Sequence, residues 1–167
     1  MPSTIPSHPG AEPHEWRIRS AQASDVAFLE RLAERLVIGI PSWRDLAAMV
    51  VTARNWWLGD LQRVGLGAAV YIAETANAQP IGAVAVARNQ HFTGAPQAEV
   101  GELAVLEEWE SQGVASALLA QAEAWAREAG LPFISLATGA ANARALGFYA
   151  RNGYRPEDIR LTKPLSS

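Results

Sequence analysis

The pattern of apolar and polar residues is most informative in residues 101–130. A short apolar run at residues 103–105 is typical of a buried strand, and a polar turn follows it at residues 107–112. After Gly113, apolar residues return at helical spacing, namely Val114, Leu118, Ala122 and Trp125. Gly130 is a typical helix end. The segment therefore predicts a strand, a tight turn and a helix.

The same patterns predict the elements on either side. Strands are expected at residues 16–19, 69–74, 81–88, 97–106, 133–137 and 159–162. Helices are expected after Ser24, after a capping box that runs from Ser42 to Asp45, and at residues 142–151. The second of these helices is expected to end near Gly59. Because a turn at residues 77–80 separates two β-like runs, we expect an antiparallel hairpin there.

The turn before Val114 favours an anionic ligand. A strand that enters a helix through a tight turn leaves the first N–H groups of the helix unpaired, at the positive end of the helix dipole. The small residues Gly113, Ala115 and Ser116 let a ligand approach this main chain closely. The site suits a phosphate or diphosphate, although an ordinary strand–helix unit with a glycine at the turn fits the spacing equally well.

Composition narrows the class of protein. The length of 167 residues suits one compact domain, with residues 1–14 as a flexible N-terminal arm and residues 15–167 as the domain. Hydrophobic residues make up 49% of the chain and charged residues 19%, which indicates a globular protein. The net charge of -3, without a basic stripe, argues against a nucleic-acid partner.

Several kinds of chemistry are excluded by residue type. The chain has no cysteine, and its three histidines are scattered without metal-ligand spacing, so neither a thiolate nucleophile nor a metal is expected. No signal peptide and no apolar run long enough to cross a membrane is recognised. We therefore expect a cytoplasmic protein without a membrane partner.

The turn also carries a sequence motif. Val105-x-x-x-Trp109-x-x-Gln112-Gly113-Val114-Ala115-x-x-Leu118-Leu119 resembles the cofactor-binding motif of the GNAT superfamily of acyl-CoA-dependent N-acetyltransferases. In that family the turn reads Arg/Gln-x-x-Gly-x-Gly/Ala, and its amides bind the diphosphate of coenzyme A. Glu110 stands where the family has the first Arg or Gln. Glu107 and Glu108 make the turn more acidic still, and we expect all three carboxylates to point to water.

A second motif follows in the expected order. Asn142-x-x-Ala145-x-x-Phe148-Tyr149-x-x-x-Gly153-Tyr154 resembles the C-terminal GNAT signature, in which an Asn contacts the cofactor and a Tyr meets the sulfur of coenzyme A. Together the two motifs imply an α+β fold, arranged as an α/β sandwich. Its sheet would be mixed, mostly antiparallel and of six to seven strands, flanked by about four helices.

The resemblance implies direct transfer of an acetyl group from acetyl-CoA to a primary amine of a small molecule, protein or peptide, in a ternary complex. Backbone groups of Leu103 and Val105 would pair with the pantetheine, and one of their N–H groups would stabilise the oxyanion. Tyr149 would return a proton to the leaving thiolate. The cofactor-binding set is Leu103, Ala104, Val105, Gln112, Gly113, Val114, Ala115, Ser116, Asn142 and Tyr149.

Two glutamates are candidates for the base that takes the proton of the amine. Glu99 and Glu102 lie three residues apart on one predicted strand, so we expect them on opposite faces of the sheet and at most one at the acceptor. Glu102 is favoured because it is nearer to the thioester-binding residues. General-base catalysis typically contributes about 10²–10⁴-fold to the rate.

Two other functions are weighed against the enzyme. Glu110 leaves room for a catalytically weak or inactive GNAT-like domain that acts as an acyl-CoA sensor or interaction module. A nucleotide-binding α/β domain would need a mainly parallel sheet, which the predicted hairpin argues against. The sequence identifies neither the acceptor nor the oligomeric state, and it leaves a homodimer open.

Overall fold

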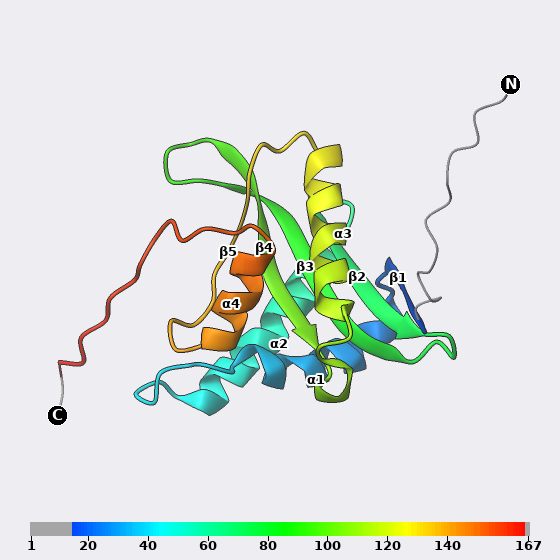
Figure 1. Cartoon of the computed structure of the whole chain (residues 1–167), viewed down its shortest axis with the longest axis horizontal. Helices are drawn as coiled ribbons and strands as arrows, with labels where there is room; N and C mark the ends of the chain where they lie inside the picture. Colours follow the sequence, from blue (N-terminus) through cyan, green and yellow to red (C-terminus); the bar gives the residue numbers. More distant parts are fainter. Residues whose placement is uncertain (1–14, 166–167) are drawn as a thin grey trace, which may run out of the picture.

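A five-stranded sheet forms the centre of the structure (Figure 1). The computed structural model describes residues 15–165, so the predicted arm, residues 1–14, lies outside the described residues. The strand order is β1-β2-β3-β4-β5, and all neighbours are antiparallel except β4 and β5, which are parallel. The strands are β1 Trp16–Ser20, β2 Ala68–Thr75, β3 Pro80–Gln90, β4 Pro96–Val105 and β5 Ile134–Leu136.

Helices cover both faces of this sheet. They are α1 Val26–Leu36, α2 Leu46–Gln62, α3 Val114–Glu128 and α4 Ala143–Arg151. α1 and α2 pack on one face, whereas α3 packs on the other with α4 beside it. The predicted α+β fold with a mixed, mostly antiparallel sheet is confirmed, but the described residues form five strands rather than six to seven. Over residues 15–165, no helix combines the length and apolarity needed to cross a membrane.

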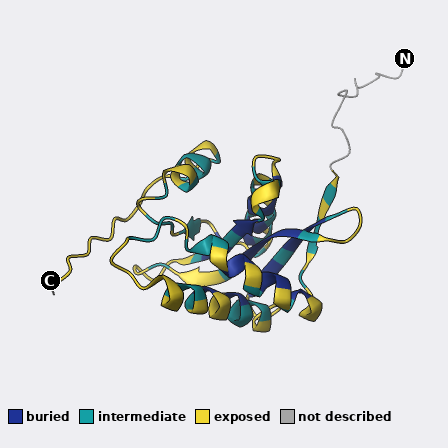
Figure 2. Ribbon diagram, turned by 90° about the horizontal axis from the view of Figure 1, so that it is seen from below, coloured by how far each residue is buried: buried dark blue, intermediate teal, exposed yellow. Residues whose placement is uncertain are grey.

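Each face of the sheet has its own apolar core. Leu29 and Leu32 of α1 and Trp57 of α2 are completely buried on one face, and Leu118 and Leu119 of α3 are buried on the other. Because both faces are covered, β2 and β3 are buried along most of their length instead of alternating between buried and exposed positions. Figure 2 shows the buried residues concentrated in the sheet and on the helix faces that meet it.

The start of α2 differs from the predicted capping box. Asp45 is itself the N-cap, because its Oδ1 accepts a hydrogen bond of 3.0 Å from the N–H of Ala48. Ser42 lies outside the helix, so it cannot fill the capping position that the sequence pattern suggested. The helix also continues past Gly59 to Gln62, since Leu61 still packs against the core.

An ion-pair network joins β1, β2 and the start of α1. Arg19 binds both carboxylate oxygens of Asp25, at 2.7 and 2.9 Å, and its Nε donates to Glu74 at 2.6 Å. Arg17 reaches the other oxygen of Glu74 at 2.7 Å. The side chains of Asp25 and Glu74 are only 5% and 2% exposed, so Arg19 neutralises two buried carboxylates at once.

A β-bulge at Gly101 changes the faces of β4. Glu102 pairs with Ala85, but the next pair along β3 is Val86 with Val100, which leaves Gly101 without a partner. Glu99 pairs with Ala87, two residues from Ala85 and therefore on the same face. The prediction that Glu99 and Glu102 face opposite sides is wrong, because the inserted residue moves both onto the face covered by α1 and α2.

The edge of β4 is open beyond this bulge. The parallel pairing with β5 involves only Ala98, Glu99 and Val100 of β4. β5 is shorter than the predicted strand at residues 133–137, and it is half-buried rather than buried. Phe133 is excluded from it and is 67% exposed. As a result, residues 103–105 pair with β3 on one side only.

The predicted closing strand at residues 159–162 does not form. Ile159 and Leu161 are 83% and 89% exposed, and this segment has no regular secondary structure. Its alternating apolar residues suit a strand, but β5 presents only three residues for pairing. The segment at residues 159–162 therefore lacks a neighbouring strand long enough to pair with.

Candidate active site

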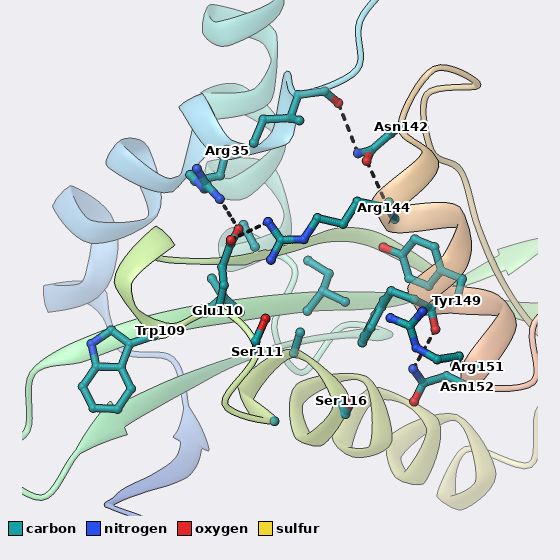
Figure 3. A pocket seen from close by; sticks show the side chains of 18 residues that line it. Arg35, Trp109, Glu110, Ser111, Ser116, Asn142, Arg144, Tyr149, Arg151 and Asn152 are labelled. Carbon is teal, nitrogen blue, oxygen red and sulfur yellow. Dashed lines mark hydrogen bonds and ion pairs between the residues drawn. The ribbon is translucent and has the colours of Figure 1, made fainter.

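A cavity of about 600 Å³ lies between the open edge of β4, the turn before α3, and α4 (Figure 3). Eight of the predicted cofactor-binding residues line it: Leu103, Ala104, Val105, Gly113, Ala115, Ser116, Asn142 and Tyr149. Gln112 and Val114 do not line it. The side chain of Gln112 braces the turn by donating to the carbonyl oxygen of Glu108 at 2.9 Å, and Val114 is buried in the core.

The open edge of β4 presents backbone groups to this cavity. The N–H of Leu106 donates to the carbonyl oxygen of Ile81 on β3 at 2.8 Å. Because backbone groups alternate in direction along an antiparallel strand, Ala104 also bonds toward β3, whereas Leu103 and Val105 direct their N–H and C=O groups away from it. Those groups are available to a ligand that lies along the strand edge.

The turn before α3 offers further donors. Gly113 has φ +81°, in the left-handed region, and no atom lies within 4 Å of the position that a Cβ would occupy there. α3 begins directly after it, so the first N–H groups of the helix have no intrahelical partner. Ala115 and Ser116 belong to this first turn and line the cavity. The turn can therefore bind an anion through its main chain.

Glu110 lies in the cavity wall, so the prediction that its carboxylate points to water is wrong. Its carboxylate forms ion pairs with Arg35 of α1 and, at 2.5 Å, with Arg144 of α4 (Figure 3). Glu107 and Glu108 are exposed, as predicted. Two arginines thus neutralise the one acidic side chain that enters the site. Sequence reasoning missed both, since they lie 75 and 34 positions from Glu110 and carry no local signal.

Tyr149 is held from both sides by aromatic rings. Its ring meets Phe148 and Tyr154 edge to face, with centroids 5.2 and 5.8 Å apart. Its hydroxyl group points into the cavity (Figure 3). Burial raises the pKa of this hydroxyl above its ordinary value, so Tyr149 is protonated at neutral pH. It is suited to donate a proton.

Asn142 fixes the start of α4. Its Oδ1 accepts from the N–H of Ala145 at 3.0 Å, and its Nδ2 donates to the carbonyl oxygen of Ile38 at 3.3 Å. Beside it, the main chains of Gly39 and Gly139 nearly touch, because a Cβ on Gly139 would lie 2.6 Å from the carbonyl oxygen of Gly39. The segment after α1 therefore clamps the segment that leads into α4.

Neither Glu102 nor Glu99 is among the residues that line the cavity. Glu102 lies on the α1–α2 face of β4, next to the lining residue Leu103, and it is only 4% exposed. Burial, together with the neighbouring carboxyls of Asp60 and Glu99, raises its pKa to about 9. Glu99 is less buried and accepts a hydrogen bond from the side chain of Asn89. Of the two candidate bases, Glu102 is the more deeply buried.

Comparison with known proteins agrees with this geometry. A family model described as the acetyltransferase (GNAT) family matches residues 28–154. An aminoalkylphosphonate N-acetyltransferase from Salmonella typhimurium is 42% identical over 67 residues, which are 40% of this chain and 44% of that protein. The chain therefore matches less than half the length of this relative.

Solved structures share the fold. A GCN5-related N-acetyltransferase from Ralstonia eutropha superposes with a TM-score of 0.69 at 23% identity, covering 90% of this chain and 98% of its own. Glucosamine-6-phosphate N-acetyltransferase from Arabidopsis thaliana gives 0.65 at 12% identity, covering 90% and 99%. At this level of identity the likeness shows the architecture alone.

Proposed function

The chain belongs to the GNAT family of acetyltransferases, and from this we propose that it transfers an acetyl group from acetyl-CoA to a primary amine of a small molecule or peptide by direct attack. GNAT acetyltransferases use acetyl-CoA as co-substrate. One observation carries the proposal: the unpaired edge of β4 at Leu103 and Val105 and the turn at Gly113 border a single cavity.

The residues present fit this co-substrate, which supplies an activated acyl group. The first amides of α3 would bind the diphosphate, and Leu103 and Val105 would pair with the amide groups of the pantetheine. An N–H group of the same strand would stabilise negative charge on the thioester oxygen. The arginines around Glu110 offset the acidic turn, which supports cofactor binding despite the departure from the family motif.

Two side chains would move the protons of the reaction. The ionised form of Glu102 would accept a proton from the amine while the nitrogen–carbon bond forms, and it would then release that proton to solvent. Tyr149 would donate its proton to the leaving sulfur as the carbon–sulfur bond breaks, and it would regain a proton from solvent. The sum converts an amine and a thioester into an amide and a thiol. The assignment of Tyr149 as the proton donor is supported by its buried hydroxyl group, which is protonated at neutral pH because burial raises its pKa.

Calorimetric titration with acetyl-CoA, followed by a thiol-release assay over a panel of amines, tests the proposal. The panel should include lysine peptides, diamines and an aminoalkylphosphonate, because the Salmonella typhimurium relative is named for that acceptor. We expect binding and turnover of at least one amine. Failure to bind acetyl-CoA would contradict the proposal. Binding without turnover would favour the acyl-CoA sensor, the second candidate, for which Glu110 is the motivating observation.

The placement of the diphosphate predicts the effect of Gly113→Asp. This change puts a side chain on a residue with φ +81° and a negative charge beside the α3 amides. We expect affinity for acetyl-CoA to fall at least 10-fold, about 1.4 kcal/mol, as like charges repel at this short range. Gly113→Asn is the matched control, because it has the same shape without the charge and asparagine tolerates positive φ. Wild-type affinity in Gly113→Asp would refute the placement.

A further inference from the structure

The bulge in β4 brings a side chain of α2 against the candidate base. A Cβ on Gly101 would lie 3.2 Å from Oδ2 of Asp60, so the glycine leaves room for this carboxyl group against the strand. Glu102 follows directly in the chain and is 4% exposed. Its Oε2 is fully buried, and no group among the described residues donates a hydrogen bond to it.

The two carboxyl groups can satisfy each other only by sharing a proton. Oδ2 of Asp60 lies against Gly101, the residue before Glu102, and after burial a hydrogen bond with Asp60 is the main cause that raises the pKa of Glu102. A pair of carboxylates has acceptors but no donor, so one group must be protonated for this hydrogen bond to form. A buried carboxyl oxygen that otherwise lacks a partner makes the shared proton strongly favourable, because an unsatisfied buried acceptor is costly.

Few other charges act on this pair. Glu99 faces the same side of β4, and Arg63 reaches Oδ1 of Asp60 at 3.5 Å. Three of the four charged residues of α1 have partners elsewhere: Arg35 pairs with Glu107 and Glu110, Glu34 pairs with Arg54, and Arg31 lies over the ring of Phe28. The fourth is Glu30, which is half-buried. The residues of β3 opposite Glu99 and Glu102 are alanines, and β5 contributes Ser135 opposite Glu99. Asp60 is thus the principal partner of Glu102.

We infer that Asp60 is a positioning residue for Glu102: it holds the buried carboxyl group at the bulge through a shared proton and thereby sets the pH at which Glu102 can accept a proton from the amine. The inference rests on the function proposed above and extends it by one residue that the family motifs do not include.

The expected consequence has a definite direction. With a pKa of about 9, Glu102 is protonated at neutral pH, and its ionised fraction rises about tenfold for each pH unit up to that value. Asp60→Asn removes one negative charge and offers an N–H donor to the carboxylate. Both changes favour the ionised form of Glu102, so its pKa should fall.

Carbon-13 NMR titration of the glutamate carboxyl groups in the full chain tests this without any substrate. We expect the midpoint of Glu102 to fall by at least one pH unit in Asp60→Asn. The acid limb of the kcat/KM profile should move by the same amount, which raises kcat/KM at pH 7 by about 10-fold. Asp45→Asn, the same change at the exposed N-cap of α2, should move neither.

Glu99→Gln provides a second comparison, because Glu99 acts on Glu102 by charge alone and should shift the midpoint less. An unchanged midpoint in Asp60→Asn would overturn the inference whatever the turnover, and so would a larger shift in Glu99→Gln. If the midpoint of Glu102 shifts in Asp60→Asn but the protein acetylates no amine, the interaction of Asp60 with Glu102 stands and the proposed enzymatic function is rejected.

Discussion

Tyr149→Phe should lower kcat by about 100-fold while leaving the affinity for acetyl-CoA nearly unchanged, because the variant loses a proton donor and keeps the ring. The edge-to-face contacts with Phe148 and Tyr154 depend on the ring alone, so packing of α4 is preserved. The measurement is steady-state kinetics with the best amine of the panel, together with calorimetry for the cofactor.

Tyr154→Phe is the matched control for this prediction. Its hydroxyl donates to Glu123 of α3 at 3.3 Å, and Tyr154 is not among the residues that line the cavity. The same loss of one oxygen should therefore leave kcat within about 2-fold of wild type, because Tyr154 contacts no reacting atom. An unchanged rate in Tyr149→Phe would remove Tyr149 as the acid and leave solvent to protonate the thiolate.

Arg19→Met should be the most destabilising of these substitutions, reducing the free energy of unfolding by about 3–4 kcal/mol. The variant leaves Asp25 without its bidentate partner and Glu74 with Arg17 alone. Both carboxylates remain buried, and an uncompensated buried charge is costly. Urea denaturation followed by tryptophan fluorescence at pH 7 measures the loss.

Arg17→Met supplies the comparison, since its side chain is 72% exposed and Arg19 still binds Glu74 when it is removed. An exposed ion pair of this kind contributes only about 0–1 kcal/mol. If both variants lose the same free energy of unfolding, the prediction that Arg19 contributes more than Arg17 is wrong.

The pH dependence of the Arg19→Met effect follows from the carboxyl groups. Hydrogen bonds from Arg19 lower the pKa of Asp25, and those from Arg19 and Arg17 lower the pKa of Glu74. A group whose pKa is lowered on folding stabilises the protein above its unfolded pKa, about 4, and this contribution is lost as the pH falls through the folded value. The difference between wild type and Arg19→Met should therefore shrink as the pH is lowered below about 4.

Local patterns in the sequence were sufficient for most helices and strands. The apolar stripe of Leu29 and Leu32 and the run from Val114 to Leu118 have short periods that a single element satisfies by itself. Gly113 and Tyr149 are expected in the site from the resemblance to the two GNAT motifs, and both line the cavity. Each motif is confined to one strand–turn–helix unit or one helix, so it can be recognised without knowledge of distant contacts.

The features that could not be predicted depend on contacts between distant segments. The bulge at Gly101 is a property of the pairing between β3 and β4, so the faces of Glu99 and Glu102 could not be read from β4 alone. Arg35 and Arg144 turn Glu110 into the cavity from two different helices. The pair of Asp60 and Glu102 likewise joins a helix to a strand that lies 42 residues away.

The clamp between Gly39 and Gly139 has a consequence for how the proposed activity would be lost on heating. α4 has no completely buried residue, and it is held by this clamp, by the hydrogen bond from Asn142 to Ile38, by the ion pair of Arg144 with Glu110 and by the partly buried rings of Phe148 and Tyr149. The amides that would bind the diphosphate, in contrast, belong to α3, whose inner face is deeply buried. Heating should therefore release the helix that carries Tyr149 before the main core melts, and inactivation would precede unfolding.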